Sequence, residues 1–225
     1  MSAANALSRE TGLRGAAVIV GLRTEARLAL RLGVPVYTGG GTAGGAAEAS
    51  RRALAGAASA LLSLGLAGGL DPALCPGDVV VPEAILTGGR VLRADPVLGE
   101  MLGGLTPHRI IGATSTVADV PSKRRLHSET DAAAVDLESG AVATLATERG
   151  LPFAALRVIC DPAERALPPA AFVALNRRGA IGIFRVLGSV LADPAQLPAL
   201  LALAHDAALA RRALAQRIAS IAARA

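Results

Sequence analysis

The chain has 225 residues, which suits one large domain with a sizeable buried core. Hydrophobic residues make up 52% of the sequence and charged residues 18%, so an intrinsically disordered chain is excluded. The net charge is +5, and almost all of the basic residues are arginines, because Lys123 is the one lysine. The arginines are scattered, and the aromatic residues that stack on bases make up only 2% of the chain. We therefore expect solvated helix faces and no nucleic-acid partner.

The targeting and cysteine patterns indicate a cytoplasmic protein without a metal site. Residues 1–14 carry charges but lack the apolar core of a secretory signal. No stretch of the sequence reaches the roughly 20 apolar residues that cross a bilayer. Cys75 and Cys160 are too few for a disulfide framework or a cysteine metal cluster, and the three histidines lie far apart. We expect neither a metal nor another cofactor.

Strand and helix patterns alternate along the chain. Apolar runs predict strands, in chain order, at residues 16–20, 34–37, 60–66, 79–81, 84–87, 109–116, 133–137 and 153–159. Apolar periodicity and helix-start residues predict helices at residues 25–32, 46–58, 123–128 and 138–149, from Pro168 onward, and at residues 180–191 and 195–223. Residues 67–72, which include two glycines, predict a loop.

This alternation predicts an α/β fold, a three-layer αβα sandwich around a mixed, mostly parallel sheet. Because no linker or internal repeat interrupts the pattern, we expect a single domain over residues 1–225, with residues 192–225 as a C-terminal helical extension. The apolar residues of the extension fall at helical spacing, which favours packing on the domain or on a second subunit of a homo-oligomer. The alternative is that the extension admits an apolar ligand or contacts a membrane surface, peripheral to the bilayer.

A glycine-rich run at residues 39–44 (GGGTAG) formally matches the dinucleotide-binding fingerprint. That fingerprint requires an acidic residue about 20 positions further on, and residues 60–70 contain none. A turn before a helix is the simpler interpretation. The alternative is that the amides of the turn bind an anion at the start of the helix.

Three acidic residues stand just beyond apolar strands. Glu25 follows the first strand, Glu138 follows the strand at residues 133–137, and Asp161 follows the buried strand at residues 153–159. Ligands of open α/β sheets bind beyond the carboxyl ends of the strands, so the three carboxylates are expected to converge on one pocket. The alternative for each acid is a helix cap or a solvated charge.

Two blocks of the sequence resemble the signatures of the nucleoside phosphorylase and nucleosidase family. The first block is residues 63–81 (SLGLAGGLDPALCPGDVVV). The second combines residues 134–139 (AVDLES) with residues 151–161 (LPFAALRVICD), and the two stand in the family's order within about residues 15–190. The resemblance implies a nucleoside phosphorylase-like sandwich and an enzyme that cleaves the N-glycosidic bond of a purine nucleoside.

Within this family the chain is most similar to the hopanoid-associated phosphorylases. The similarity rests on residues 21–26 (GLRTEA), residues 161–170 (DPAERALPPA) and the long C-terminal Ala/Leu helix. That subgroup is understood to remove adenine from adenosylhopane, whose 5′ carbon carries a triterpenoid, in hopanoid side-chain biosynthesis. The implied partner is a small nucleoside with an apolar 5′ group. A general methylthioadenosine/adenosylhomocysteine-type nucleosidase and a non-catalytic nucleoside-binding protein are the alternatives.

The resemblance also implies catalytic roles for the three acids. Asp161 donates a proton to N7 of the departing adenine, and Glu138 accepts hydrogen bonds from the ribose hydroxyls as positive charge develops on the sugar. Glu25 stands where hydrolytic members carry the glutamate that activates water, which favours hydrolysis. Phosphorolysis is the alternative, and the residues available for phosphate are then Arg23, Arg27 and Gly41.

Further residues are expected to contact the nucleoside. Leu137 takes the place of a common methionine under the sugar, and Gly68 lies in the first family block. Val120 and Phe172 are expected to form walls of the purine pocket. Leu66 departs from the relatives that carry a hydroxyl residue near the nucleophile.

Overall fold

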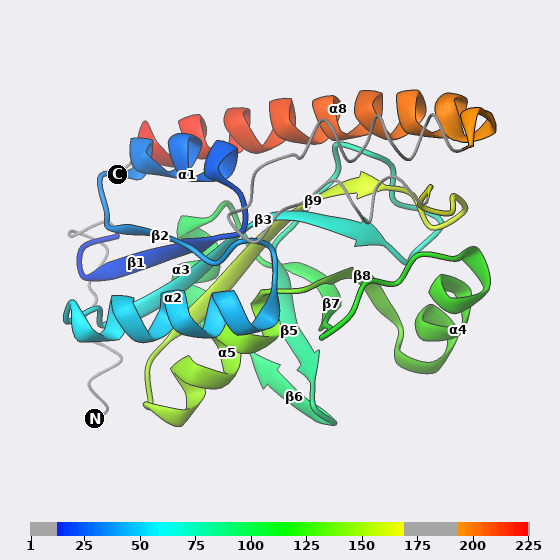
Figure 1. Ribbon diagram of the computed structural model, residues 1–225. Helices are drawn as coiled ribbons and strands as arrows, with labels where there is room; N and C mark the ends of the chain where they lie inside the picture. The colour runs from blue at the N-terminus through cyan, green and yellow to red at the C-terminus, as the bar shows by residue number, and fades with distance from the viewer. Residues whose placement is uncertain (1–12, 169–192, 225) are drawn as a thin grey trace.

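The computed structural model describes residues 13–168 and 193–224, and in these residues nine strands form one sheet (Figure 1). The strands are β1 (Ala16–Val20), β2 (Val36–Thr38), β3 (Ala60–Gly69), β4 (Val79–Val80), β5 (Pro82–Thr87), β6 (Arg90–Arg93), β7 (Thr106–Gly112), β8 (Ala132–Asp136) and β9 (Phe153–Asp161). Their order is β2-β1-β3-β8-β7-β5-β6, with β9 paired to β3 and β4 paired to β9. Antiparallel pairing joins β3 to β8, β4 to β9 and β5 to β6, and the other pairs are parallel. The predicted mixed, mostly parallel sheet is confirmed.

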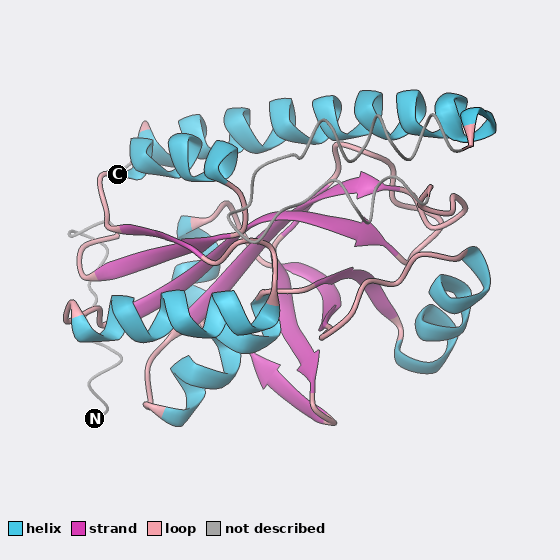
Figure 2. Ribbon diagram, in the orientation of Figure 1, coloured by secondary structure: helices cyan, strands magenta, loops and turns pink. Residues whose placement is uncertain are grey.

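Helices cover both faces of the sheet, as Figure 2 shows. The helices are α1 (Arg23–Ala29), the 3₁₀ helix η2 (Leu30–Leu32), α2 (Ala43–Ala55), α3 (Pro96–Met101), α4 (Val120–Thr130), α5 (Ser139–Glu148), the 3₁₀ helix η3 (Pro194–Gln196) and α8 (Leu197–Ala222). Helices α1 and α8 lie on one face, and α2 and α5 lie on the other (Figure 1). The three-layer αβα sandwich is therefore confirmed.

The strand period of two separates the hydrophobic residues into two cores. In β1, Val18 and Val20 face the α1 and α8 side, whereas Ile19 faces the α2 and α5 side. The helices α2 and α5 contribute mainly alanines to their core. Helix α8 contributes a stripe at helical spacing, which consists of Ala210 and the larger side chains of Leu214, Ile218 and Ile221.

The structure differs from the sequence prediction where backbone pairing is long-range. Residues 67–69, predicted as a loop, continue β3, because Gly68 and Gly69 pair with residues of β8. Strand β7 ends at Gly112, earlier than predicted, where the chain passes against α5. A Cβ atom on Gly112 would lie 2.3 Å from Cα of Gly140. The elements β6 and α3 were not predicted, although Asp95 caps α3 and a proline follows it.

The C-terminal extension is helical, as predicted, and its two halves have different surroundings. The second half of α8 packs into the core beside α1 and η2, whereas the first half exposes Leu197 and Leu201. Packing against a second subunit and contact with an apolar ligand or membrane surface both remain predictions. The helices predicted from Pro168 and at residues 180–191 lie outside the described residues. Among the described helices, none combines the length and apolar character needed to span a bilayer.

Candidate active site

A cavity of about 500 Å³ opens at the carboxyl ends of β1, β3, β8 and β9. It lies where ligands of open α/β sheets bind, beyond the ends of the strands. Glu25, Glu138 and Asp161 all line it, although they are far apart in the sequence. The three acids that the sequence placed at strand ends therefore meet at one cavity.

Glu25 is held in place by two backbone amides that follow β1 and by one within β3. Its Oε2 accepts hydrogen bonds from the amides of Gly21 (3.1 Å) and Leu22 (2.7 Å), and its Oε1 accepts one from Leu66 (3.2 Å). The carboxyl group belongs to the first turn of α1, where the helix dipole favours an acidic residue. Burial raises the pKa of Glu25, and this effect outweighs the lowering by the amides and by the positive charge of Arg157.

Glu138 stands at the start of α5 and is buried beside the other carboxylates. Its Oε1 accepts a hydrogen bond from the amide of Gly41 (3.1 Å), in the glycine-rich loop before α2. Burial raises the pKa of Glu138 to about 8, and the nearby charges of Glu25 and Asp136 add to the increase. The positive charge of Arg157 and the Gly41 amide act in the opposite direction. Glu138 therefore keeps its proton to a much higher pH than an exposed glutamate.

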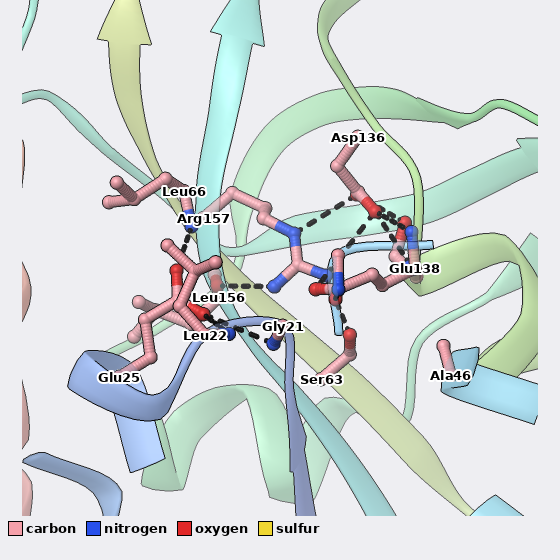
Figure 3. A network of polar contacts seen from close by, with 12 residues as sticks. Gly21, Leu22, Glu25, Ala46, Ser63, Leu66, Asp136, Glu138, Leu156 and Arg157 are labelled. Carbon is pink, nitrogen blue, oxygen red and sulfur yellow. Dashed lines mark hydrogen bonds and ion pairs between the residues drawn. The ribbon is translucent and has the colours of Figure 1, made fainter. Parts of the chain in front are cut away.

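Arg157 and Asp136 form a buried ion pair, and Figure 3 shows Arg157 between Glu25 on one side and Asp136 and Glu138 on the other. Arg157 is fully buried in β9, its Nε lies 3.0 Å from Oδ2 of Asp136, and its Nη2 donates to Oγ of Ser63 (2.6 Å). Its Nη2 also lies 3.9 Å from Oε2 of Glu138. Oδ1 of Asp136 in turn accepts hydrogen bonds from the backbone amides of Glu138 and Ser139. This network fixes the start of α5. It also places the positive charge of Arg157 near the carboxyl groups of Asp136, Glu138 and Glu25.

The pKa of Asp136 is lowered in this network. Burial alone would raise the pKa, but the positive charge and hydrogen bonds of Arg157, together with the hydrogen bonds from Ser139, outweigh the burial. Burial would likewise lower the pKa of Arg157, and the surrounding carboxylates raise it instead. Asp136 and Arg157 are therefore a charged pair inside the protein.

Asp161 is held by the one lysine of the chain. Lys123 lies near the start of α4 and is fully buried. Its Nζ donates to Oδ2 of Asp161 (2.5 Å) and to the carbonyl oxygens of Pro162 (2.9 Å) and Arg165 (2.9 Å). All three donor hydrogens of the ammonium group thus have acceptors.

Three glycines make room for the three carboxylates. A Cβ atom on Gly21 would lie 2.3 Å from Oε1 of Glu138, and one on Gly65 would lie 3.1 Å from Oε1 of Glu25. A Cβ atom on Gly68 would lie 3.2 Å from both carboxyl oxygens of Asp161. These positions accept the acids because they have no side chain.

The structure brings together some of the other predicted site residues. Leu137, Gly68 and Gly41 line the cavity with the acids, as does Leu66. Val120 is not among the described residues that line it, and Val117, three residues earlier, takes that place.

The two arginines predicted for phosphate lie elsewhere. Arg23 and Arg27 are exposed on α1, and neither is among the described residues of the cavity wall. Phe172 lies outside the described residues.

Sequence reasoning missed the two buried cations, Lys123 and Arg157. Each had a signal: Lys123 is the one lysine of an arginine-rich chain, and Arg157 interrupts an apolar run that predicts a covered strand. A charge in such a strand requires a buried partner of opposite sign.

The sequence belongs to a known superfamily. A family model of the phosphorylase superfamily matches residues 22–101 and 104–191, which is most of the chain, so the protein is a member of that superfamily. The fold and the superfamily together define an enzyme that cleaves N-glycosidic bonds. No curated protein sequence matches the chain significantly.

Solved structures share this fold. The 5′-methylthioadenosine/S-adenosylhomocysteine nucleosidase of Helicobacter pylori is similar with a TM-score of 0.69 and 15% identity, over 93% of this chain and 98% of that one. The corresponding nucleosidase of Neisseria meningitidis, in complex with methylthio-immucillin-A, gives a TM-score of 0.67 and 17% identity, over 92% and 97% of the two chains. The futalosine hydrolase of Helicobacter pylori gives 0.63 and 18%, over 79% and 97%.

Proposed function

We propose that the protein hydrolyses the N-glycosidic bond of an adenine nucleoside with a bulky apolar 5′ group. One observation carries the proposal: Glu25 in α1, Glu138 at the start of α5 and Asp161 at the end of β9 line the same cavity. Cleavage of this bond passes through a cationic, oxocarbenium-like sugar. Such a reaction needs a proton donor for the base, a partner for the sugar and an activator of the nucleophile, and the cavity offers one acid for each.

Each acid has a defined part in the reaction. Asp161 passes a proton to N7 while the bond between C1′ and N9 breaks and its electron pair moves into the purine. Glu138 accepts hydrogen bonds from the ribose hydroxyls. Glu25 removes a proton from the water that attacks C1′. A raised pKa suits this last role, because a general base works best when its pKa is close to the working pH.

The anion-binding groups at the cavity favour water over phosphate as the nucleophile. The amides of Gly21, Leu22 and Leu66 bind the carboxylate of Glu25, and the amide of Gly41 binds Glu138. A phosphate ion would have to displace these carboxyl groups from the amides, and no arginine is among the described residues that line the cavity. Water meets neither obstacle.

Adenosylhopane is the substrate that we propose. Its support is the resemblance to the hopanoid-associated phosphorylases, together with a cavity wall that includes the apolar side chains of Leu22, Leu66, Val117, Leu137 and Leu167. The second candidate is a general methylthioadenosine/adenosylhomocysteine nucleosidase. The similarity in fold to nucleosidases of that type favours it.

Adenine release by the purified protein tests both parts of the proposal. Adenosylhopane, methylthioadenosine and adenosylhomocysteine are compared with and without phosphate, and the sugar product is identified. We expect free ribosyl product without phosphate, fastest release from adenosylhopane, and a loss of about 10²–10⁴-fold in kcat for Asp161→Asn. Glu148→Gln, at an exposed position at the end of α5, is the matched control.

Each other outcome has a definite meaning. A strict need for phosphate would refute hydrolysis, and faster cleavage of methylthioadenosine would favour the second candidate. Equal adenine release by Asp161→Asn and the parent would refute the role of Asp161 as the donor. Binding of nucleosides without any turnover would identify a nucleoside-binding protein.

A further inference from the structure

The contact between Lys123 and Asp161 is the part of the site that the three-acid mechanism does not use. Lys123 is fully buried, and a cation near the N-terminal end of a helix such as α4 is unfavourable. Desolvating an ammonium group without a partner is more costly still. Among the described residues, the carboxylate within ion-pair distance of Nζ is that of Asp161. The position of Lys123 is thus explained by this one acid.

The two oxygens of Asp161 have different surroundings. Oδ2 accepts the hydrogen bond from Lys123, whereas Oδ1 lies 3.4 Å from the thiol sulfur of Cys160. Gly68, opposite both oxygens, contributes no side chain, and Asp161 lines the cavity. The carboxyl group therefore lies between the lysine and the space for the substrate.

In the ion pair with Lys123, the carboxylate of Asp161 lacks the proton that it would donate to the purine. A carboxylate paired with an ammonium group has no proton to give, whereas the ammonium group has one. Nζ of Lys123 and Oδ2 of Asp161 are 2.5 Å apart, so the ammonium group donates a direct, charge-assisted hydrogen bond to the carboxylate.

We propose, building on the function proposed above, that Lys123 is a positioning residue that supplies the proton which Asp161 passes to N7 of the purine. The proton moves from Nζ to Oδ2, and the carboxyl group, then neutral, delivers it to N7 as the bond between C1′ and N9 breaks. Lys123 is left as a neutral amine, Asp161 is again a carboxylate, and Glu25 holds the proton taken from water. Exchange with solvent then returns one proton to Lys123 and removes one from Glu25.

The experiment compares two leaving groups in the parent and in Lys123→Met. One substrate is the adenine nucleoside on which the parent is most active, and the other is the same nucleoside methylated at N7, which already carries its positive charge. For the adenine nucleoside we expect kcat to fall by about 10²–10⁴-fold and KM to change less than about threefold. For the methylated nucleoside we expect kcat to stay within about fivefold of the parent.

Two further variants separate chemistry from folding. Arg124→Met changes an exposed residue of the same helix and serves as the control. The double variant Lys123→Met with Asp161→Asn removes both buried charges, so it folds even if the single variant does not. If Lys123 acts through Asp161, the double variant releases adenine no more slowly than Asp161→Asn alone.

The pH dependence of kcat is an independent test of the role of Lys123. Without Lys123, Asp161 must take its proton from solvent, so adenine release by Lys123→Met rises as the pH falls from 8 to 5, more steeply than in the parent. Equal losses on both substrates, or a profile parallel to the parent's, would show that Lys123 only holds the loop after β9. Full activity of Lys123→Met would refute the proposal outright. If the parent cleaves neither substrate, the proposed function itself is wrong.

Discussion

Replacing Glu138 with glutamine tests the electrostatics of the cavity through the stability of the protein. Glutamine keeps the shape of the side chain and can still accept the hydrogen bond from the amide of Gly41. It removes the carboxyl group whose pKa is raised from 4.5 to about 8. The variant therefore isolates the effect of one titrating group.

The sign follows from counting protons in the two states. Between pH 4.5 and about 8, Glu138 holds its proton in the folded protein but has released it in the unfolded chain. The folded state binds more protons, so the free energy of unfolding falls as the pH rises through this interval. The interval from 4.5 to about 8, at about 1.4 kcal/mol per pH unit, corresponds to about 5 kcal/mol. Below pH 4.5 the group is protonated in both states and contributes no pH dependence.

Urea unfolding of the parent, Glu138→Gln and the exposed control Glu148→Gln at pH 5 to 8.5 measures the effect. We expect the parent and the control to lose about 4 kcal/mol of stability relative to Glu138→Gln as the pH rises, because the measured range begins at pH 5 and covers about 3 pH units of the interval. Parallel stability curves for the parent and Glu138→Gln would refute the reasoning, because they would mean that Glu138 titrates alike in the folded and unfolded states.

Three other substitutions give distinct results. Gly68→Ala places a Cβ atom 3.2 Å from both carboxyl oxygens of Asp161, so we expect the rate of adenine release to fall at least about tenfold. The free energy of unfolding, measured by thermal denaturation, changes by less than about 1 kcal/mol. An unchanged rate of adenine release would contradict this expectation. Arg157→Met leaves Asp136 buried without its cation, so chemical denaturation shows a loss of about 3–5 kcal/mol, and an equally stable variant would contradict the structural role of the pair. Glu25→Gln lowers kcat by about 10²–10⁴-fold with little change in KM, and a large rise in KM alone would instead indicate a binding role.

The sequence was informative where local pattern decides the structure. The apolar run of β9 and the helical pattern of α5 correspond to elements in the structure, whereas α4 begins at Val120, earlier than the predicted start at residue 123. The family blocks and the strand ends also predicted that Glu25, Glu138 and Asp161 converge, and all three line one cavity. These signals need only neighbouring residues or a known order of elements.

The rest depended on contacts between distant segments. Residues 67–69 look like a loop because glycines favour turns, but their pairing with β8 and β9 makes them part of a strand. Lys123 and Asp161 are 38 residues apart, so no local pattern could pair them. Val120 was predicted where Val117 lies, because the orientation of a helix start relative to a cavity cannot be derived from its sequence.

A crystal structure with an uncleavable adenine nucleoside analogue tests the central claim most directly. We expect N7 of the purine within hydrogen-bond distance of Asp161, the ribose hydroxyls at Glu138, and a water molecule between Glu25 and C1′. An analogue whose sugar–base linkage lies away from any one of these three carboxylates would contradict the proposed chemistry.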